Sequence, residues 1–505
     1  MSAPTPFTPL SHAQVLDLLA EGHAGGTTVV TPNARLAQSL ARDFDAAQAA
    51  RGALAWETAD VLPLATLVAR LYEDALYAPG GDGRLPLLLT PAQEQALWEQ
   101  AIEAGPAGGN ELLALSATAV EAQAAWTLAQ QWNIAAAATD PRGPFVRGED
   151  TLAFAHWASD YARRCEREGC IDAARLPDLV VRLLPALALP RRVVAYGFDR
   201  IPPQAEALLR ALAARGVEVH AGTPPSHAGA APLHASGAPP RASGAPVRAS
   251  MASARDEIES AARWARARLE AAAARGVSPR IGIVVPDLGQ RRKAIAQALA
   301  RILAPAVNLP GSETRALPFN LSLGQPLSEF ALVHAALGWL NLAAGEADYS
   351  LVSRLLRSPF AAGAAQEAMA RARLDAQLRR GAAPRAGLAQ VAAWVAPHAQ
   401  GVPLLHARMS AVLEYAREHL AGRRPAHAWA QHFTALLGTL GFPGERALDS
   451  SEYQAQAKWT ETLAQFARLS RVLPPLSARE AAARLSRLCA GTLFQPENRG
   501  APIQV

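Results

Sequence analysis

Lysine is the residue type that most restricts the chemistry of this chain, because it occurs only twice, as Lys293 and Lys458. A phosphate-binding P-loop needs Gly-Lys-Ser/Thr, since its lysine must reach the β- and γ-phosphates of a nucleotide. Lys293 lies in Arg-Lys-Ala and Lys458 in Ala-Lys-Trp, so neither can be that lysine. The first predicted strand also ends in Thr-Pro-Asn, with no glycine-rich loop. We therefore expect no ATP hydrolysis by this route.

The same two lysines argue against a PD-(D/E)XK nuclease site in this chain. Such a site requires an acidic residue two positions before a lysine, so that the carboxylate and the amine act on one metal ion and its water. The residues at those two positions are Arg291 and Gln456. We therefore expect this chain to lack that site.

The remaining reactive residues form no recognisable site. Cys165 and Cys170 lie five apart in a helical region and do not share a face well, which favours two ordinary thiols over a metal site. The 12 histidines show no HExxH spacing, and no GxSxG elbow occurs. Asp199 is a possible magnesium ligand, but one carboxylate without a P-loop is a poor metal site, so we interpret it as a loop or helix-entry residue. We expect no catalytic residue, metal or cofactor in this chain.

Composition indicates a globular protein of a reducing compartment. Half of the 505 residues are apolar, and only 3 are cysteines. The N-terminus lacks the features of a signal peptide, and the longest apolar runs are too short to span a bilayer, so we expect a cytoplasmic protein with no membrane partner. The net charge of +5 permits a nucleic-acid partner without demanding one. Codon bias in a GC-rich genome explains why 47 of the 49 basic residues are arginine.

The stretch Val193–Leu212, VVAYGFDRIPPQAEALLRAL, is the element most suited to position a ligand. Val193–Tyr196 is a short apolar run typical of a strand covered on both faces. Pro202 and Pro203 can open a helix, and the apolar residues after them fall on one helical face. Strand, loop and helix in this order form the unit of an α/β nucleotide-binding fold, whose ligands bind where strands end. A purely structural βα unit is the alternative.

Two more strands and a helical block belong to the first half of the chain. Thr27–Thr31 predicts a strand that Pro32-Asn33 ends, a helix follows at Ala34–Ala50, and Val217–Ala221 predicts another strand. From Thr90 to Leu189 the pattern is helical throughout, with Thr90 as a helix cap. We interpret the tryptophans of this block as core residues: Trp98, Trp126, Trp132 and Trp157.

The composition changes abruptly at Gly222–Ala254, which is built from Ala, Pro, Ser and Gly and predicts a linker or surface loop. A second α/β unit then begins. Its expected elements are a helix capped by Ser253, a buried strand at Arg280–Pro286, a helix at Ala294–Leu303, a loop at Phe319–Gln325 and a helix at Leu327–Leu342. After a second helical region, Pro502–Val505 predicts a strand that either pairs as an edge or leads into further chain.

These patterns divide the chain into seven segments. We expect an α/β domain in segments 1–85 and 191–222, interrupted by a helical insertion at 86–190, and a linker at 223–254. We expect a second α/β domain beginning at 255–342, with a helical insertion at 343–490 and a returning strand within 491–505.

Eight stretches, in this order along the chain, resemble the bacterial "probable DNA repair protein" family, which is related to the AddB and RecB helicase-nucleases. None is a catalytic signature by itself, and the resemblance depends on their order. The stretches are VVTPNARLAQSL, WETADVLPLATLV, LTPAQEQALWEQAI, VVAYGFDRIPPQAEALLRAL, DEIESAARWARARL with RIGIVVPDLGQRR, FNLSLGQPLSEFALVHAALGWL, LLRSPF and FQPENRGAPIQV.

The resemblance implies two RecA-like domains of the superfamily 1 helicase type, each with a large all-helical insertion, and a second domain that is incomplete at the C-terminus. It places Val29–Asn33 where active helicases have their P-loop and Tyr196–Gln204 near the magnesium-binding strand end. Both sites look degenerate here, at Thr31, Pro32, Asn33, Asp199 and Gln204. The family's PD-(D/E)XK nuclease domain would follow this chain.

We therefore expect a DNA-repair protein whose helicase-like frame binds single-stranded DNA or duplex ends without ATP, as the scaffold of an AddB/RecB-type exonuclease. Backbone phosphates would be met by Asn33 and Arg35 after the first strand, and by Arg291 and Arg292 after the strand at 280–286. A partner helicase-nuclease subunit is possible. We consider three alternatives to this hypothesis: a protein-interaction scaffold without DNA affinity, an ATP-driven helicase, and a small-molecule α/β enzyme. No group of residues in the sequence supports the last of these.

Overall fold

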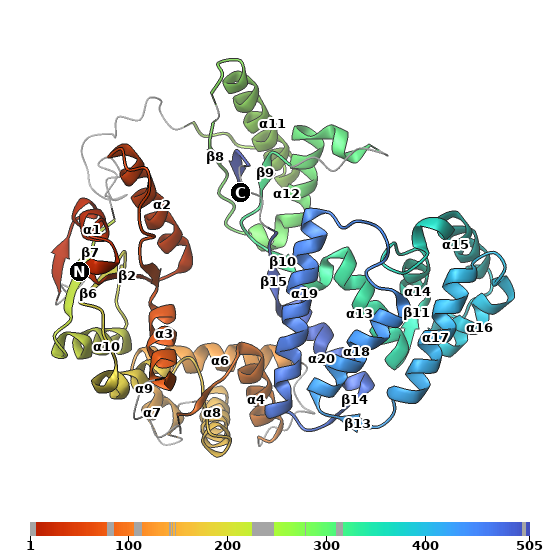
Figure 1. The fold of residues 1–505 in the computed structure, drawn as a ribbon, viewed down its shortest axis with the longest axis horizontal. Coiled ribbons are helices and arrows are strands. Elements are labelled where there is room, and N and C mark those ends of the chain that lie inside the picture. The colour runs from red at the N-terminus through yellow and green to blue at the C-terminus, as the bar shows by residue number, and fades with distance from the viewer. Residues whose placement is uncertain are drawn as a thin grey trace. The chain divides into compact units, whose positions relative to one another are not determined.

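The structure, a computed structural model, describes residues 7–77, 85–105, 114–140, 143, 145–146, 148–224, 247–277, 279–309, 317–496 and 501–505. The chain divides into two units, Met1–Ala245 and Pro246–Val505, which we treat one at a time (Figure 1). This division falls inside the predicted linker at 223–254, of which residues 225–246 lie outside the described part.

A five-stranded, fully parallel sheet forms the centre of the first unit. The strands predicted at 27–31, 193–196 and 217–221 are confirmed to within one residue as β2, β6 and β7. Two short strands that the sequence did not predict complete it at the edges. In spatial order the strands are β1 (Thr8–Leu10), β7 (Glu218–Gly222), β6 (Arg192–Tyr196), β2 (Thr27–Thr31) and β3 (Val61–Pro63).

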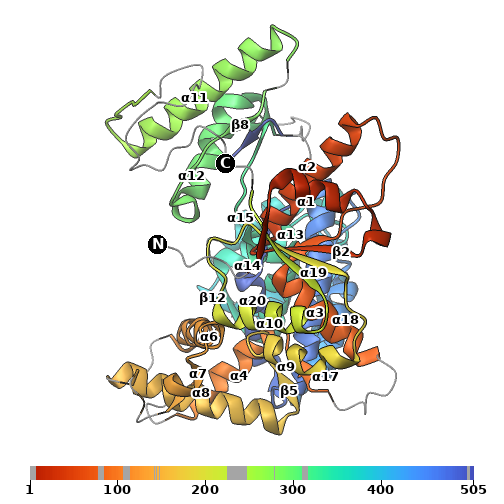
Figure 2. The same ribbon diagram turned by 90° about the vertical axis from the view of Figure 1, so that its left-hand side faces the viewer.

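Helices cover both faces of this sheet. Successive side chains of a strand point to opposite faces, so Val29 and Val194 face one layer and Val30 and Val193 the other. The first layer is α1 (His12–Leu19) and α2 (Ala34–Ala50); the second is α3 (Leu64–Tyr77), α9 (Leu176–Leu183) and α10 (Pro203–Ala214). The side view shows α1 and α10 on opposite sides of the strands (Figure 2). Double cover explains why every residue of β2 and β6 is buried.

The sheet is doubly wound. From β2 the chain passes through α2 to β3 at one edge, whereas from β6 it passes through α10 to β7 in the opposite direction. The strand order therefore reverses between the neighbours β2 and β6. In open parallel sheets, the crevice beyond the carboxyl ends of two such strands is the usual ligand site.

A helical block lies between β3 and β6 in the sequence. It consists of α4 (Pro91–Glu103), α6 (Leu115–Gln131), α7 (Ala135–Thr139) and α8 (Glu149–Arg167), with a short parallel pair, β4 (Leu87–Leu88) and β5 (Cys170–Ile171). The prediction of helix throughout 90–189 is wrong at β5, where the chain turns back before α9 joins the cover of the sheet.

Aromatic side chains form the core of this block. Trp98 stacks on Tyr161 with ring centroids 4.2 Å apart, and Trp126 meets both rings edge-on. The predicted core role is thus confirmed for Trp98 and Trp126, whereas Trp157 is only partly buried and Trp132 is 40% exposed. Thr90 caps α4 as predicted, in a capping box with Gln93.

The second unit has a smaller sheet covered on one face. Its three parallel strands are, in spatial order, β8 (Ile281–Gly282), β16 (Ile503–Gln504) and β9 (Phe319–Asn320). Ile281, Ile503 and Phe319 pack against α11 (Ala254–Ala273) and α12 (Leu288–Leu303), and Ser253 caps α11 as predicted. Of the residues that alternate with them, Gly282 and Gln504 are exposed and Asn320 is half-buried.

The two strand predictions in this unit are confirmed in place but not in detail. The buried strand expected at Arg280–Pro286 has only two strand residues, and Val284 is 92% exposed. Pro502–Val505 forms a strand as predicted, but the alternative of edge pairing is wrong, because β16 is the central strand and its hydrogen bonds run to β8 on one side and β9 on the other.

The rest of the second unit is a bundle around α13 (Ala331–Ala344), whose side chains are buried nearly all round. The helix expected at Leu327–Leu342 begins at Ala331, after a 3₁₀ turn at Leu327–Glu329, and the loop expected at Phe319–Gln325 contains β9 and the start of β10. The other helices are α14 (Tyr349–Leu356), α15 (Ala364–Leu378), α16 (Leu388–Val395), α17 (Pro403–His419), α18 (Ala426–Leu440), α19 (Ser450–Arg468) and α20 (Ala478–Gly491).

Three short antiparallel pairs connect this bundle: β10 (Gln325–Pro326) with β15 (Leu493–Phe494), β11 (Glu346–Asp348) with β12 (Arg385–Gly387), and β13 (Arg423–Arg424) with β14 (Leu476–Ser477). Within the described ranges, no helix has both the length and the apolar character needed to cross a membrane.

Candidate functional site

The first candidate site is the crevice at the carboxyl ends of β2 and β6, where the strand order reverses. One side of it is the turn Thr31-Pro32-Asn33 between β2 and α2. The other side is the segment from Gly197 to Asp199 between β6 and α10. The fold thus brings four of the predicted positions, Thr31, Pro32, Asn33 and Asp199, to one edge of the sheet.

The turn after β2 is closed by its own side chains. The buried Thr31 hydroxyl donates to the Asn33 carbonyl oxygen at 2.8 Å. Asn33 is the N-cap of α2, and its Oδ1 accepts the Leu36 N–H at 2.9 Å. A phosphate loop works by leaving such helix-start N–H groups free for the phosphate oxygens. Here the Asn33 side chain already occupies one of those donors.

An apolar contact fills the space between the two sides. Gly197 has a φ of +72°, and a Cβ at this position would lie 2.4 Å from Cδ2 of Leu36 in the first turn of α2. Leu36 therefore rests directly on the glycine backbone at the strand crossover. A leucine side chain therefore occupies part of the crevice at the strand crossover, where ligands of open parallel sheets usually bind.

The other predicted residues of this edge have separate surroundings. Gln204 is buried and donates through Nε2 to the Ala174 carbonyl oxygen and to Asp178 Oδ2, both at 2.9 Å, so it fixes α10 to α9. Asp199 and Arg35 are exposed and have no side-chain partner among the described residues. This arrangement offers no set of ligands around Asp199.

A tyrosine–histidine pair at the same edge was missed by the sequence analysis. His12 Nδ1 lies 2.7 Å from the hydroxyl of Tyr196, the last residue of β6. Burial and the nearby Asp43 carboxylate raise the pKa of Tyr196 to about 12, so its hydroxyl stays protonated. Only the parallel pairing that brings β1 near β6 places these residues together, and no spacing in the sequence indicates it.

The two arginines predicted after the second-unit strand are both engaged within the fold. Arg291 Nε lies 2.6 Å from Asp287 Oδ2, and its guanidinium also reaches Glu257 at 3.4 Å. Arg292 donates to the Leu323 carbonyl oxygen and to Gln325 Oε1, each at 3.0 Å, and burial lowers its pKa. A largely apolar cavity of about 210 Å³ adjoins Arg291, between α11 and the segment leading into α12.

A buried ionisable cluster lies inside the helical block of the first unit. Burial, more than any other cause, raises the pKa of Glu94 to about 7, although the Ala173 N–H donates to it at 3.0 Å. The adjacent Asp172 accepts from Arg175 Nε at 2.7 Å. Cys165 and Cys170 are buried free thiols, and the hydrogen bond between them and burial raise the pKa of Cys165. Within the described residues, no three His, Cys, Asp or Glu side chains are grouped as a metal site would require.

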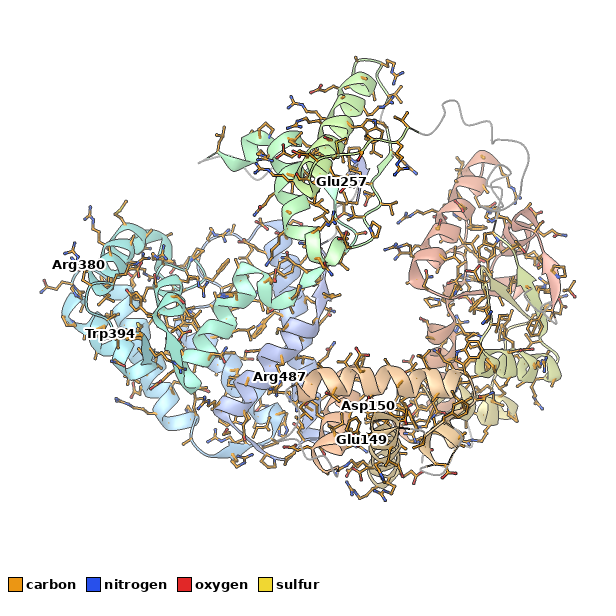
Figure 3. All side chains as sticks on the ribbon, turned by 180° about the vertical axis from the view of Figure 1, so that it is seen from behind. Glu149, Asp150, Glu257, Arg380, Trp394 and Arg487 are labelled. Atoms are coloured by element: carbon orange, nitrogen blue, oxygen red, sulfur yellow. The ribbon has the colours of Figure 1, made fainter. Side chains whose placement is uncertain are left out.

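Charge separates sharply between the two units. The first unit has 18 Lys and Arg against 25 Asp and Glu, a net charge of −7; the second has 31 against 19, a net charge of +12. In the first unit, Glu149 and Asp150 are exposed at the start of α8 (Figure 3). The net charge of the whole chain does not reveal this asymmetry, because the charges of the two units largely cancel.

Many second-unit arginines are exposed and have no carboxylate partner among the described residues. They lie on four helices of the bundle or directly after one, and Figure 3 labels two of them, Arg380 and Arg487. The six clearest are Arg354, Arg373, Arg380, Arg417, Arg479 and Arg487. Unpaired guanidinium groups are the natural partners of phosphate oxygens.

Scanned against protein-family models and searched against curated proteins, the chain returns no match in either comparison.

Proposed function

We propose that this protein is a DNA-repair protein: an ATP-independent, helicase-like scaffold that binds single-stranded DNA or duplex ends through its second unit. In this proposal the two α/β units are degenerate RecA-like domains, as the sequence resemblance implies, and the nuclease activity of an AddB/RecB-type exonuclease resides outside this chain.

The observation that carries the proposal is the charge separation. A net charge of +12 on residues 246–505, beside −7 on residues 1–245, is the electrostatic footprint expected of a unit that meets a polyanion. Because the unpaired arginines are distributed over the bundle rather than gathered in one motif, they suit sequence-independent contacts with backbone phosphates.

The closed crevice in the first unit supports the absence of a motor. An ATP-driven helicase needs free backbone donors and a lysine at the end of its first strand. This chain has the Asn33 cap and the Leu36–Gly197 contact at that place, and its only two lysines, Lys293 and Lys458, lie in the second unit. The residues at this place therefore do not support the alternative of an ATP-driven helicase.

Filter binding of the full chain to a labelled 20-nucleotide strand and to a blunt duplex, at low and high salt, tests the proposal. We expect saturable binding at low salt and a slope of log K against log [salt] that reports several phosphate contacts. Arg380→Gln with Arg487→Gln should reduce that slope by about 2, whereas Arg35→Gln in the acidic unit should leave it nearly unchanged.

Absence of binding to both DNAs at low salt would contradict the proposal and favour the protein-interaction scaffold. An ATP titration provides the second readout. We expect no saturable ATP binding. A saturable, magnesium-dependent signal would instead favour the hypothesis of an ATP-driven helicase.

A further inference from the structure

A depression of about 420 Å³ opens between the first turn of α13 and the end of α14 in the second unit. Its polar lining consists of one carboxylate, Glu329, and four side chains that can donate hydrogen bonds: His334, Arg354, Arg357 and Ser358. It belongs neither to the β2–β6 crevice nor to the surroundings of Arg291. Two of these donors, Arg357 and Ser358, lie in the LLRSPF stretch.

Two of the donors are free. Arg354 is exposed and its guanidinium has no hydrogen-bond or ion-pair partner among the described residues. The half-buried ring of His334 has no hydrogen-bond partner there either. Burial and the neighbouring Arg354 charge lower the pKa of His334, so its ring is neutral near pH 7 and offers one N–H donor. An anion between these two side chains would offset the Arg354 charge and accept a hydrogen bond from the His334 ring.

The other two donors are fixed in place. Arg357 Nε lies 3.0 Å from Asp375 Oδ2 and also donates to the Ser353 carbonyl oxygen at 3.1 Å. The buried Ser358 Oγ accepts the Phe360 N–H at 3.3 Å, which orients the hydroxyl group. These bonds hold the segment after α14 in one conformation, so the depression is formed before any ligand arrives.

The carboxylates around the depression are already compensated. Glu329 is 3.3 Å from Lys293 Nζ. Asp375 is shared by Arg357 at 3.0 Å and Arg379 at 2.9 Å. With both acids paired, the Arg354 charge is left in excess at the opening. The start of α13, where Ala331 lines the depression and Phe330 provides no side-chain cap, adds the positive end of a helix dipole.

We propose that this depression is a phosphate-binding site, with Arg354 and His334 as the groups that contact the phosphate oxygens. Guanidinium and imidazole N–H donors converging on a small cavity suit a tetrahedral anion with several acceptor oxygens. The phosphate is one from a nucleic-acid backbone, an identification that rests on the proposed function; the recognition chemistry itself is shared with inorganic phosphate.

The test uses the full chain and three variants: Arg354→Gln, His334→Gln, and, as matched control, Arg417→Gln. Arg417 is also exposed and unpaired among the described residues, and it does not line the depression. Fluorescence anisotropy with a labelled 20-nucleotide strand measures affinity. NMR of the histidine ring protons, with the His334 signal assigned by its absence in His334→Gln, measures the response to inorganic phosphate against chloride at equal ionic strength.

We expect Arg354→Gln to weaken oligonucleotide binding about tenfold and His334→Gln about threefold, while Arg417→Gln changes it less than twofold. Inorganic phosphate should raise the pKa of His334 saturably in the native protein and leave it unchanged in Arg354→Gln. Oligonucleotide binding equal in Arg354→Gln and Arg417→Gln, with no phosphate effect on His334, overturns the site and leaves the proposed function standing. A saturable phosphate effect without oligonucleotide binding supports the site and overturns the proposed function.

Discussion

The two parallel sheets of this chain have the same kind of strand but different surroundings. In the first unit, helices cover both faces, so every residue of β2 and β6 is buried. In the second unit, α11 and α12 cover one face, and Gly282 and Gln504 of the other face are exposed. Burial on both faces leaves neither side of a strand free for solvated polar residues, whereas cover on one face leaves half of each strand free to be polar.

The two units also differ in net charge. The doubly covered first unit is acidic and its strand crossover is filled by Leu36, whereas the second unit is basic and has the depression at Arg354. Two buried acids also differ in their partners: Glu94 in the first unit accepts from the neutral Ala173 N–H and Gln123 amide, whereas Asp375 in the second is paired with Arg357 and Arg379. In the proposed function, the first unit is therefore structural and the second meets the DNA.

The largest expected effect comes from a charge placed in each sheet. Val194→Asp would bury a carboxylate between two helix layers, and we expect a loss of more than about 4 kcal/mol, enough to unfold the first unit. Gly282→Asp on the open face should change stability by less than about 0.5 kcal/mol, since a Cβ there meets no atom within 4 Å. Urea unfolding followed by circular dichroism compares the two variants. Equal losses in both would contradict the difference in cover.

A second, smaller effect concerns the pH dependence of the first unit. Because the pKa of Glu94 is raised to about 7 in the folded state, that state binds the proton more tightly than the unfolded chain. The resulting stability is fully present below pH 4.5 and is lost as the pH rises through 7, by up to about 3 kcal/mol. Glu94→Gln should flatten this decline, as measured by urea midpoints from pH 5 to 8.

Glu103→Gln is the matched control for that experiment, because Glu103 lies on the same helix and is exposed. It should keep the wild-type slope. Asp375 provides the opposite sign in the second unit: its lowered pKa gives stability that is present above its unfolded pKa and is lost in acid. A Glu94→Gln variant with an unchanged slope would show that Glu94 is not the source of the decline.

A third effect tests the closed crevice. Gly197→Ala combines a positive φ with a Cβ 2.4 Å from Leu36 Cδ2, and we expect a loss of about 2 kcal/mol, while Gly282→Ala should change stability by under about 1 kcal/mol. In the double variant with Leu36→Ala the loss should be less than the sum of the two single losses, because the shortened side chain removes the clash. Strict additivity in thermal unfolding would indicate that the two residues are not in contact.

The sequence was sufficient for elements whose pattern is local. The strands at 27–31, 193–196 and 217–221, the helix at 34–50 and the caps at Thr90 and Ser253 all follow from apolar runs and capping residues. Pairing was not predictable, because which strand lies beside which depends on contacts far apart in sequence. Edge pairing is one of the two alternatives that the sequence leaves for Pro502–Val505, whereas β16 pairs on both sides, with strands about 180 and 220 residues earlier.

The candidate sites show the same limit. The positions of the two lysines predict that no P-loop lysine follows β2. They do not reveal that Leu36 occupies the crevice, because that contact joins α2 to the turn after β6. The sequence indicates Arg291 and Arg292 only by their place after a strand, whereas in the structure their guanidiniums are engaged by Asp287 and by the Leu323 carbonyl oxygen. Counting charge separately for each predicted domain is the one sequence signal that would have pointed to the second unit.

Hydrogen–deuterium exchange of the full chain, with and without a 20-nucleotide single strand at low salt, tests the central claim most directly. We predict slowed exchange in the second unit, including residues 331–360 around the depression, and no change in residues 29–36 of the first unit. Protection of residues 29–36, with the second unit unaffected while the oligonucleotide is bound, would contradict the account.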